Sequence, residues 1–127
     1  MVEEFDDHPH LEHRALQIWQ ILISRAHNRQ TINYEELADE MGFGGPRPLY
    51  RMLGHVAAYC ALNGLPLLST LTVNKESGAP TEGTFGRDPN KERERVFRHP
   101  WFQTYPPAPE EFAEAFEEAN KRDWDLL

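Results

Sequence analysis

The spacing of apolar side chains along the chain predicts two amphipathic helices with a shorter helix between them. Over about residues 9–27, apolar positions recur every three or four residues, and polar side chains occupy the opposite face. The same spacing returns after the glycine and proline run at residues 44–48. Each stripe is expected to face a hydrophobic core. The residues of the two stripes are Leu11, Ala15, Ile18, Trp19, Leu22, Ile23 and Ala26, then Leu49, Leu53, Val56, Ala57 and Cys60.

Local signals mark the boundaries of these helices. Asp7 fits the cap of the first helix. In the shorter helix, predicted over residues 31–42, Asn33 and Glu36 have the three-residue spacing of a capping box. Gly42 supplies the left-handed residue that ends this helix. The second and third helices are therefore joined by a tight turn.

The segment after the third helix has the pattern of a short β-hairpin. Asn63-Gly64 ends the helix, and residues 65–73 form an apolar run with β-branched side chains, which is typical of a buried strand. Residues 74–78 form a turn, and residues 81–85 fit the return strand. Helix, turn, helix and hairpin in this order predict a winged helix-turn-helix.

The last part of the chain adds further structure to this core. The polar, mixed-charge run at residues 86–95 is expected to be a loop or the start of a helix. The proline-rich run at residues 105–109 interrupts the chain stiffly, and an acidic helix over residues 109–122 covers the core with its apolar side. The predicted fold is therefore mostly helical (α+β): a single winged-helix domain over residues 1–127, with a short hairpin wing and extra N- and C-terminal helices. Residues 106–127 are its acidic C-terminal extension.

Length and composition narrow the class of protein. The 127 residues, 39% of them hydrophobic, suffice for one domain with its own core and are too few for two ordinary domains. No stretch approaches the ~20 apolar residues of a membrane span, and the N-terminus is acidic where a secretory signal would be basic. The single cysteine, Cys60, excludes an internal disulfide and fits a reducing compartment. We expect a cytoplasmic protein.

The distribution of charge is more informative than the net charge of −8. Residues 1–43 carry nine acidic and three basic side chains, and residues 106–127 carry seven and two. The middle of the chain, residues 44–105, carries five acidic and eight basic side chains. Net charge affects long-range association, whereas a local basic patch decides contact with a polyanion. The middle segment therefore allows a nucleic-acid partner, with a modest affinity that falls with salt.

Cationic side chains gather on the third helix and in the hairpin turn. Arg47 and Arg51 are four residues apart and His55 follows one turn later, so all three are expected to point outward together. Lys75, in the hairpin turn, is placed to meet a phosphate. Ordinary surface arginines and turn lysines have the same pattern, so each position also allows that simpler interpretation.

The other reactive side chains do not assemble into a site. His8, His10 and His13 are close in sequence, but a metal site needs more ligands in a fixed geometry, so we interpret them as solvated. Cys60 lies on the apolar stripe and is interpreted as a small core residue. The sequence has no glycine-rich phosphate motif and no nucleophile paired with a base, so we expect no cofactor, no metal and no enzymatic activity.

Three stretches of the chain together carry a set of family motifs. They are Thr31-Ile32-Asn33-Tyr34-Glu35-Glu36-Leu37-Ala38, Tyr50-Arg51-Met52-Leu53-Gly54 and Asn63-Gly64-Leu65-Pro66-Leu67. These resemble, in the same order, Thr-x-Tyr-Gly-Glu-(Leu/Val/Ile)-Ala, Ala-Arg-Ala-Val-Gly and Asn-Pro-Leu-Pro-Ile in the C-terminal, DNA-binding domain of alkylguanine-DNA alkyltransferases and alkyltransferase-like proteins. The resemblance covers about residues 15–86. It implies that Tyr34 contacts a DNA phosphate, that Arg51, with Tyr50 beside it, enters the duplex, and that Asn63 lies in the turn before the active site.

The chain departs from this family at the active site itself. The family's Pro-Cys-His-Arg motif would fall within Leu68 to Thr72, which reads Leu-Ser-Thr-Leu-Thr. Alkyl transfer needs a thiolate, which a serine or threonine without a base does not replace. The sequence therefore predicts a non-enzymatic protein that binds double-stranded DNA, with a role in damage recognition, repair or transcriptional control. The alternative is a protein-interaction module that no longer binds DNA and meets a basic partner through its acidic ends.

Overall fold

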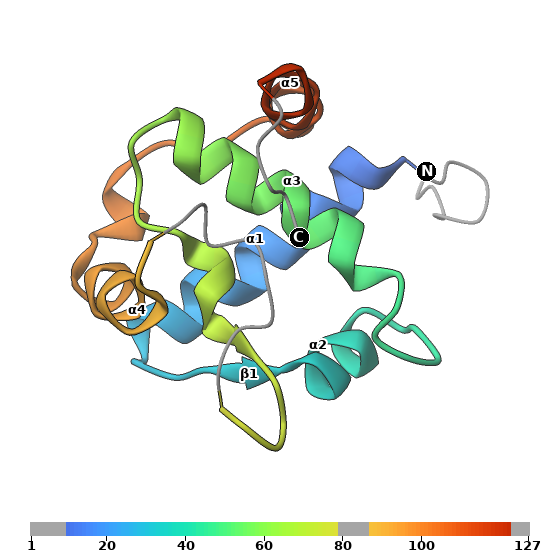
Figure 1. The fold of residues 1–127 in the computed structure, drawn as a ribbon, viewed down its shortest axis with the longest axis vertical. Helices are drawn as coiled ribbons and strands as arrows, with labels where there is room; N and C mark the ends of the chain where they lie inside the picture. Colours follow the sequence, from blue (N-terminus) through green and yellow to red (C-terminus); the bar gives the residue numbers. More distant parts are fainter. Residues whose placement is uncertain (1–9, 79–86, 123–127) are drawn as a thin grey trace.

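The computed structural model of the chain describes residues 10–78 and 87–122, which are mostly helical with one very short parallel sheet (Figure 1). Within these two ranges, no helix is both long and apolar enough to cross a bilayer. The elements, in chain order, are α1 (Leu11–His27), β1 (Ile32–Asn33), α2 (Tyr34–Glu40), α3 (Leu49–Leu62), the 3-10 turn η1 (Leu68–Leu71), β2 (Thr72–Val73), α4 (Pro89–Arg98), the 3-10 turn η2 (Trp101–Gln103) and α5 (Pro109–Lys121).

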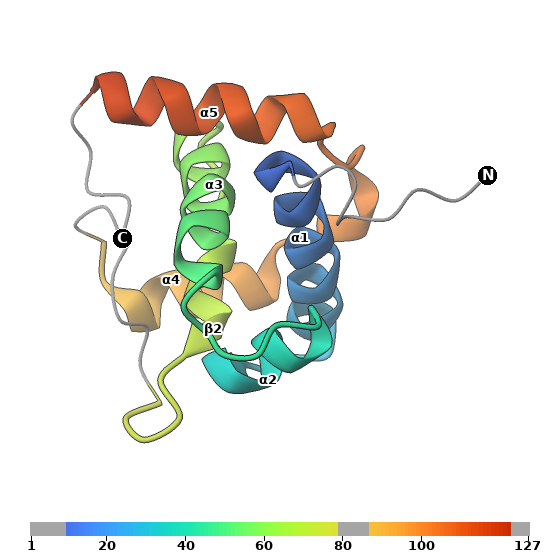
Figure 2. The same ribbon diagram turned by 90° about the vertical axis from the view of Figure 1, so that its right-hand side faces the viewer.

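The core lies where α1, α3 and α5 meet. α1 and α3 lie side by side, and α5 crosses both of them (Figure 2). At the centre, the Trp19 ring of α1 makes edge-to-face contacts with the rings of Tyr59, Trp101 and Phe112, at centroid distances of 5.5, 5.4 and 5.8 Å. Both apolar stripes predicted from the sequence contribute to this core, and Cys60 is buried in it.

The predicted capping residues of α2 are confirmed, although the helix covers only Tyr34–Glu40 of the predicted residues 31–42. The Asn33 side chain accepts a hydrogen bond from the Glu36 N–H at 2.8 Å, and the Glu36 carboxylate accepts one from the Asn33 N–H at 3.4 Å, which completes the capping box. Gly42 has a φ of +78°, so it is the left-handed residue that ends this helix. The turn between α2 and α3 therefore begins where the sequence indicated.

The predicted strand at residues 65–73 is wrong for most of its length. Residues 68–71 form η1, where the Thr70 hydroxyl donates to the Leu67 carbonyl at 2.7 Å, and β2 has two residues. The burial of Leu67, Leu68 and Leu71 suits a single helical turn as well as a strand, and the local hydroxyl bond favours the turn.

The predicted hairpin wing is not confirmed. β2 pairs in parallel with β1, with Thr72 opposite Ile32 and Val73 opposite Asn33. The return strand predicted at residues 81–85 lies outside the described residues. The described sheet therefore joins the start of α2 to the end of the η1 segment, and no winged helix is established by it.

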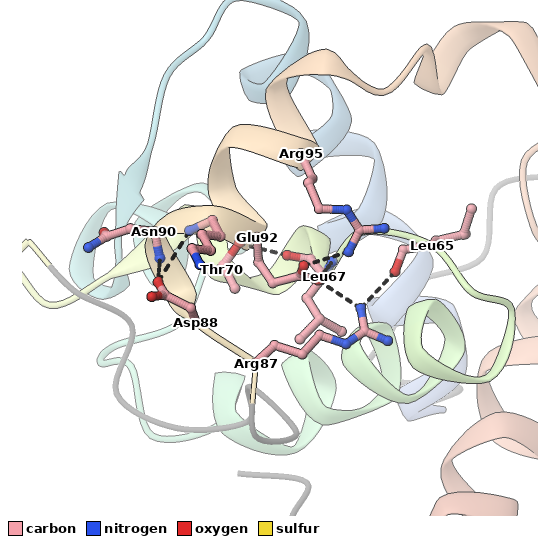
Figure 3. A network of polar contacts seen from close by, with 9 residues as sticks. Leu65, Leu67, Thr70, Arg87, Asp88, Asn90, Glu92 and Arg95 are labelled. Atoms are coloured by element: carbon pink, nitrogen blue, oxygen red, sulfur yellow. Dashed lines mark hydrogen bonds and ion pairs between the residues drawn. The ribbon is translucent and has the colours of Figure 1, made fainter.

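The polar run predicted as a loop or helix start contains α4. Asp88 caps this helix by accepting hydrogen bonds from the Asn90 and Lys91 N–H groups at 2.9 and 3.3 Å. One turn later, Glu92 is 4% exposed. Its carboxylate accepts hydrogen bonds from Arg87 at 2.7 Å, Arg95 at 2.6 Å and the Leu67 N–H at 3.1 Å (Figure 3). This charged network holds α4 against the segment before η1.

Candidate nucleic-acid interface

The first turn of α3 is its most accessible part. Pro48 precedes the helix and has no side-chain capping bond, and the first turn carries no acidic residue. The Leu49 N–H is bonded to the Pro46 carbonyl at 2.9 Å. A helix start of this kind presents backbone N–H groups and the positive end of the helix dipole. Both features favour an anion at this position.

Three of the predicted contact residues gather at this turn. Arg47, Tyr50 and Arg51 are all exposed. Tyr50 packs beside Tyr34 of α2, with ring centroids 5.5 Å apart. Tyr34 itself is buried, so Tyr50 presents the accessible aromatic ring of this pair. The structure therefore brings two arginines and one aromatic ring to a single helix start.

The prediction that His55 points outward with the two arginines is wrong. His55 is 5% exposed, and its Nδ1–H donates to the Arg51 carbonyl at 2.7 Å. Its ring stacks on Phe116 of α5 at a centroid distance of 4.0 Å and an interplanar angle of 5°. Burial lowers the pKa of His55 below its ordinary value, outweighing the bond to that carbonyl. α5 covers this side of α3, and the four-residue spacing alone does not reveal that.

Phe116 was not anticipated as a neighbour of the interface. Besides stacking on His55, its ring centroid lies 5.8 Å from the Arg51 guanidinium carbon. This distance is within the range of cation–π attraction. The sequence predicts only that the last helix covers the core with its apolar side, and no local signal shows that Phe116 lies beside residues some sixty positions earlier.

Lys75 and Asn63, which were also predicted as contact residues, lie outside the first turn of α3. Lys75 borders a hollow of about 260 Å³ beside the Gly44–Gly45 turn, with Glu35 and Asp39 among the other lining residues. Asn63 follows the last turn of α3 and donates to the Tyr59 carbonyl at 2.9 Å. Fifteen residues lie between it and Arg47, and the 14 residues of α3 among them span roughly 20 Å. Lys75 therefore lies among carboxylates beside α2 and the Gly44–Gly45 turn, and Asn63 lies at the C-terminal end of α3.

Arg47 and Arg51 differ from most other cations of the described residues because they have no hydrogen-bond or ion-pair partner there. Among the described residues, four cationic side chains have neither a hydrogen bond nor an ion pair: Arg47, Arg51, Lys75 and Lys91. The remaining arginines and lysine bind carboxylates, carbonyls or amides. These paired residues are Arg14, Arg25, Arg29, Arg87, Arg93, Arg95, Arg98, Lys121 and Arg122.

A second hollow, between α1 and α2, is polar but already internally bonded. It has a volume of about 560 Å³ and is lined in part by Arg14, Arg25 and Glu40. Arg25 donates to Glu40 at 2.6 Å, and Arg14 donates to Gln17 at 2.8 Å. Its arginines are therefore less available to a ligand than those at the start of α3.

The remaining reactive groups do not form a nucleophilic centre here. Burial raises the pKa of the Cys60 thiol to about 12, so the thiol stays protonated at neutral pH. The Leu68–Thr72 stretch, where the resemblance would place an active site, is the buried η1 turn and the start of β2. Its serine and threonines are not accompanied by a histidine within the stretch.

No protein-family model, curated protein or solved structure matches this chain. The likeness to alkyltransferase domains therefore stays a prediction from sequence motifs.

Proposed function

We propose that this protein binds double-stranded DNA without catalysing a reaction on it, and that the first turn of α3 is the contact. The observation that carries the proposal is local charge pairing: Arg47 and Arg51 are exposed cations with no hydrogen-bond or ion-pair partner among the described residues. A phosphate that binds such a side chain does not have to displace an existing carboxylate. Most other described cations would have to give up a partner.

The helix start adds a second attraction to the same place. Its uncapped N–H groups and helix dipole favour a phosphate, and guanidinium groups bind phosphate oxygens in pairs. Tyr50, 38% exposed and between the two arginines in sequence, offers a ring and a hydroxyl at the same helix start. Arg47 and Arg51 would therefore position the protein on the backbone, with Tyr50 close to the groove.

The arrangement of α2, the turn and α3 suits a helix-turn-helix contact limited to the end of α3. α5 packs on the later turns of α3 through small side chains, Ala58 against Ala115 and Ala119. A groove can therefore receive the start of α3 but not its covered half. Recognition helices of helix-turn-helix proteins commonly contact bases through their N-terminal residues.

The direct test is fluorescence anisotropy of the purified protein with a short labelled duplex across a salt series. We expect affinity to fall with salt, because binding releases counterions from the neutralised phosphates. Replacing Arg47 or Arg51 by Ala should weaken binding about tenfold and reduce the salt slope by about 1. A duplex with an alkylated guanine, run in parallel, tests the lesion specificity that the family resemblance implies.

Lys91→Ala is the matched control for these variants. Lys91 is an exposed, unpaired cation on α4, so its replacement changes net charge by the same amount at another place. Its affinity should stay close to that of the unchanged protein. Equal losses in all three variants would mean that net charge, not the α3 start, governs binding, and no binding at low salt would refute the proposal.

A protein-interaction function is the second candidate, favoured by the outer face of α5. Glu110, Glu114 and Glu117 are exposed there at helical spacing. An acidic face of this kind repels a polyanion and suits a basic partner. If DNA is not retained at low salt while a basic protein binds and is released by replacing these three residues with Gln, this second function is the correct one.

A further inference from the structure

The stretch between η2 and α5 has a surface that the DNA-binding proposal does not use. It runs along the outer edge of the molecule, at the left of Figure 1, from Thr104 to the first residue of α5. Tyr105 is 96% exposed, and Pro106 and Ala108 are exposed as well. Pro107, in the middle, is buried. Tyr105 therefore exposes an aromatic ring in a segment whose middle residue, Pro107, is buried.

The covalent chemistry of this stretch fixes an extended left-handed backbone. Proline holds its own φ near −65° and drives the preceding residue toward the β or polyproline II region. Three prolines therefore constrain the whole run from Tyr105 to Pro109. Within the run, Ala108 has φ −78° and ψ 153°, which is polyproline II, and Thr104, just before the run, is extended with φ −116° and ψ 157°. Proline chemistry and the Ala108 dihedral angles together favour polyproline II over residues 105–108, and Pro109 begins α5.

The burial pattern matches the three edges of such a segment. Polyproline II has three residues per turn, so positions three apart share an edge. Tyr105 and Ala108 form one exposed edge, and Pro106 and Pro109 form the next, of which Pro109 is half-buried. Pro107 lies on the third edge and is packed against the protein. Two neighbouring edges are therefore presented outward, which is how a polyproline segment would enter a groove.

The segment is also held in place at both ends. On one side, the buried Trp101 ring donates from Nε1 to the Val96 carbonyl at 2.8 Å. On the other side, the Ala108 N–H donates to the Glu111 carboxylate and the Glu111 N–H donates to the Ala108 carbonyl, each at 3.0 Å. A ligand that is already ordered loses little conformational freedom when it binds.

We propose that residues 105–109 are a docking ligand for a partner protein whose aromatic-lined groove takes polyproline II segments. The sequence x-Pro-Pro-x-Pro supplies two x-Pro pairs, Tyr105-Pro106 and Ala108-Pro109, one turn apart. Glu110 and Glu111 follow directly and carry no basic neighbour in the next residues. Charge complementarity therefore requires a groove with a basic rim at that end.

The test is NMR titration of the isotope-labelled 127-residue protein with three purified probes: an SH3, a WW and an EVH1 domain, each chosen with a basic groove rim. At least one should give saturable shifts confined to residues around 104–111. Replacing Tyr105 by Ala or Pro106 by Ala should weaken that binding about tenfold, as expected for anchor residues. Unperturbed spectra elsewhere would show that each variant remains folded.

Phe102→Ala is the matched control, because Phe102 is another exposed aromatic ring, 62% exposed, that lies outside the segment. Its replacement should leave binding unchanged. The proposal is overturned if none of the three domains gives saturable shifts. It is equally overturned if binding survives both segment variants or is lost as strongly in the control.

Discussion

The Cys60 side chain illustrates how surroundings decide the chemistry of a single residue. Its thiol is fully buried on the core side of α3, and desolvation holds its pKa at about 12. A thiol in this state has almost no reactive thiolate at neutral pH. It serves as a small apolar side chain in the core, as its place on the apolar stripe predicts.

We predict that Cys60 in the folded protein resists thiol reagents at pH 8. An exposed cysteine, introduced as Glu76→Cys, should react at least about a thousandfold faster, because its thiol pKa stays near 8.5. Mass spectrometry of timed reactions with iodoacetamide measures both rates in one molecule. Denaturant should make the two sites equally reactive, and rapid modification of Cys60 in native buffer would contradict this burial.

Individual capping residues could be predicted from the sequence, whereas contacts between distant residues could not. The Asn33 cap depends on residues three positions apart, so spacing is sufficient to find it. The orientation of His55 depends on Phe116, which comes from a helix sixty-one residues later. Arg47 and Arg51 are both exposed, but Arg47 precedes the first residue of α3, so helical spacing does not relate the two side chains. The spacing fails for His55 because α5 covers that side of α3.

At the scale of elements, α4 depends on the buried carboxylate of Glu92. Burial alone would raise its pKa, but hydrogen bonds from Arg87 and Arg95 outweigh burial and hold that pKa below the ordinary 4.5. A carboxylate with a lowered folded pKa stabilises the fold fully above its unfolded pKa. That contribution disappears as the pH falls through the lowered value.

We predict that Glu92→Gln lowers the free energy of unfolding by about 1–3 kcal/mol at pH 7, because two guanidinium groups lose their counter-charge. The difference from the unchanged protein should shrink as the pH falls below 4.5 and through the lowered pKa of Glu92, where the carboxylate takes up a proton. Urea titrations at pH 7 and through this range of pH measure it. Glu94→Gln is the control: Glu94 also joins two arginines, Arg29 and Arg98, but at the surface, so its cost should be smaller.

Elements with strong helical periodicity were predicted well, and short apolar runs were not. The first, third and last helices follow continuous stripes, and each was placed within a few residues of its observed bounds. The run at residues 65–73 is too short for periodicity to separate a strand from a 3-10 turn. α4 lacks a broad apolar stripe. Its buried Glu92 can be recognised only once Leu67 and the two arginines are seen around it (Figure 3).

At the scale of the whole molecule, the net charge of −8 opposes the local attraction proposed at the start of α3. The repulsion between the net negative charge of the protein and the DNA is long-ranged, so its strength depends on screening by salt. The Debye length is about 30 Å at 10 mM salt and about 8 Å at 0.15 M. Distant carboxylates should weaken DNA binding in dilute buffer and matter less under physiological conditions.

We predict that replacing Glu3, Glu4, Asp6 and Asp7 by their amides raises duplex affinity several-fold at ~10 mM salt and much less at ~0.15 M. The change reduces the net charge from −8 to −4. Anisotropy titrations at the two salt concentrations measure the effect. Exchanging glutamate for aspartate and the reverse at the same four positions keeps the charge and should change nothing. A gain that persists equally at high salt would indicate a specific contact instead.

The aromatic cluster around Trp19 gives the protein a built-in optical signal. The Trp19 indole contacts the rings of Tyr59 in α3, Trp101 in η2 and Phe112 in α5, each in edge-to-face geometry. Coupled rings in an asymmetric, rigid setting produce near-ultraviolet circular dichroism, which disappears when packing is lost although helices remain. Loosening of α5 can therefore be followed without any label, and a Trp124→Phe variant would leave Trp19 and Trp101 as the tryptophans that report it.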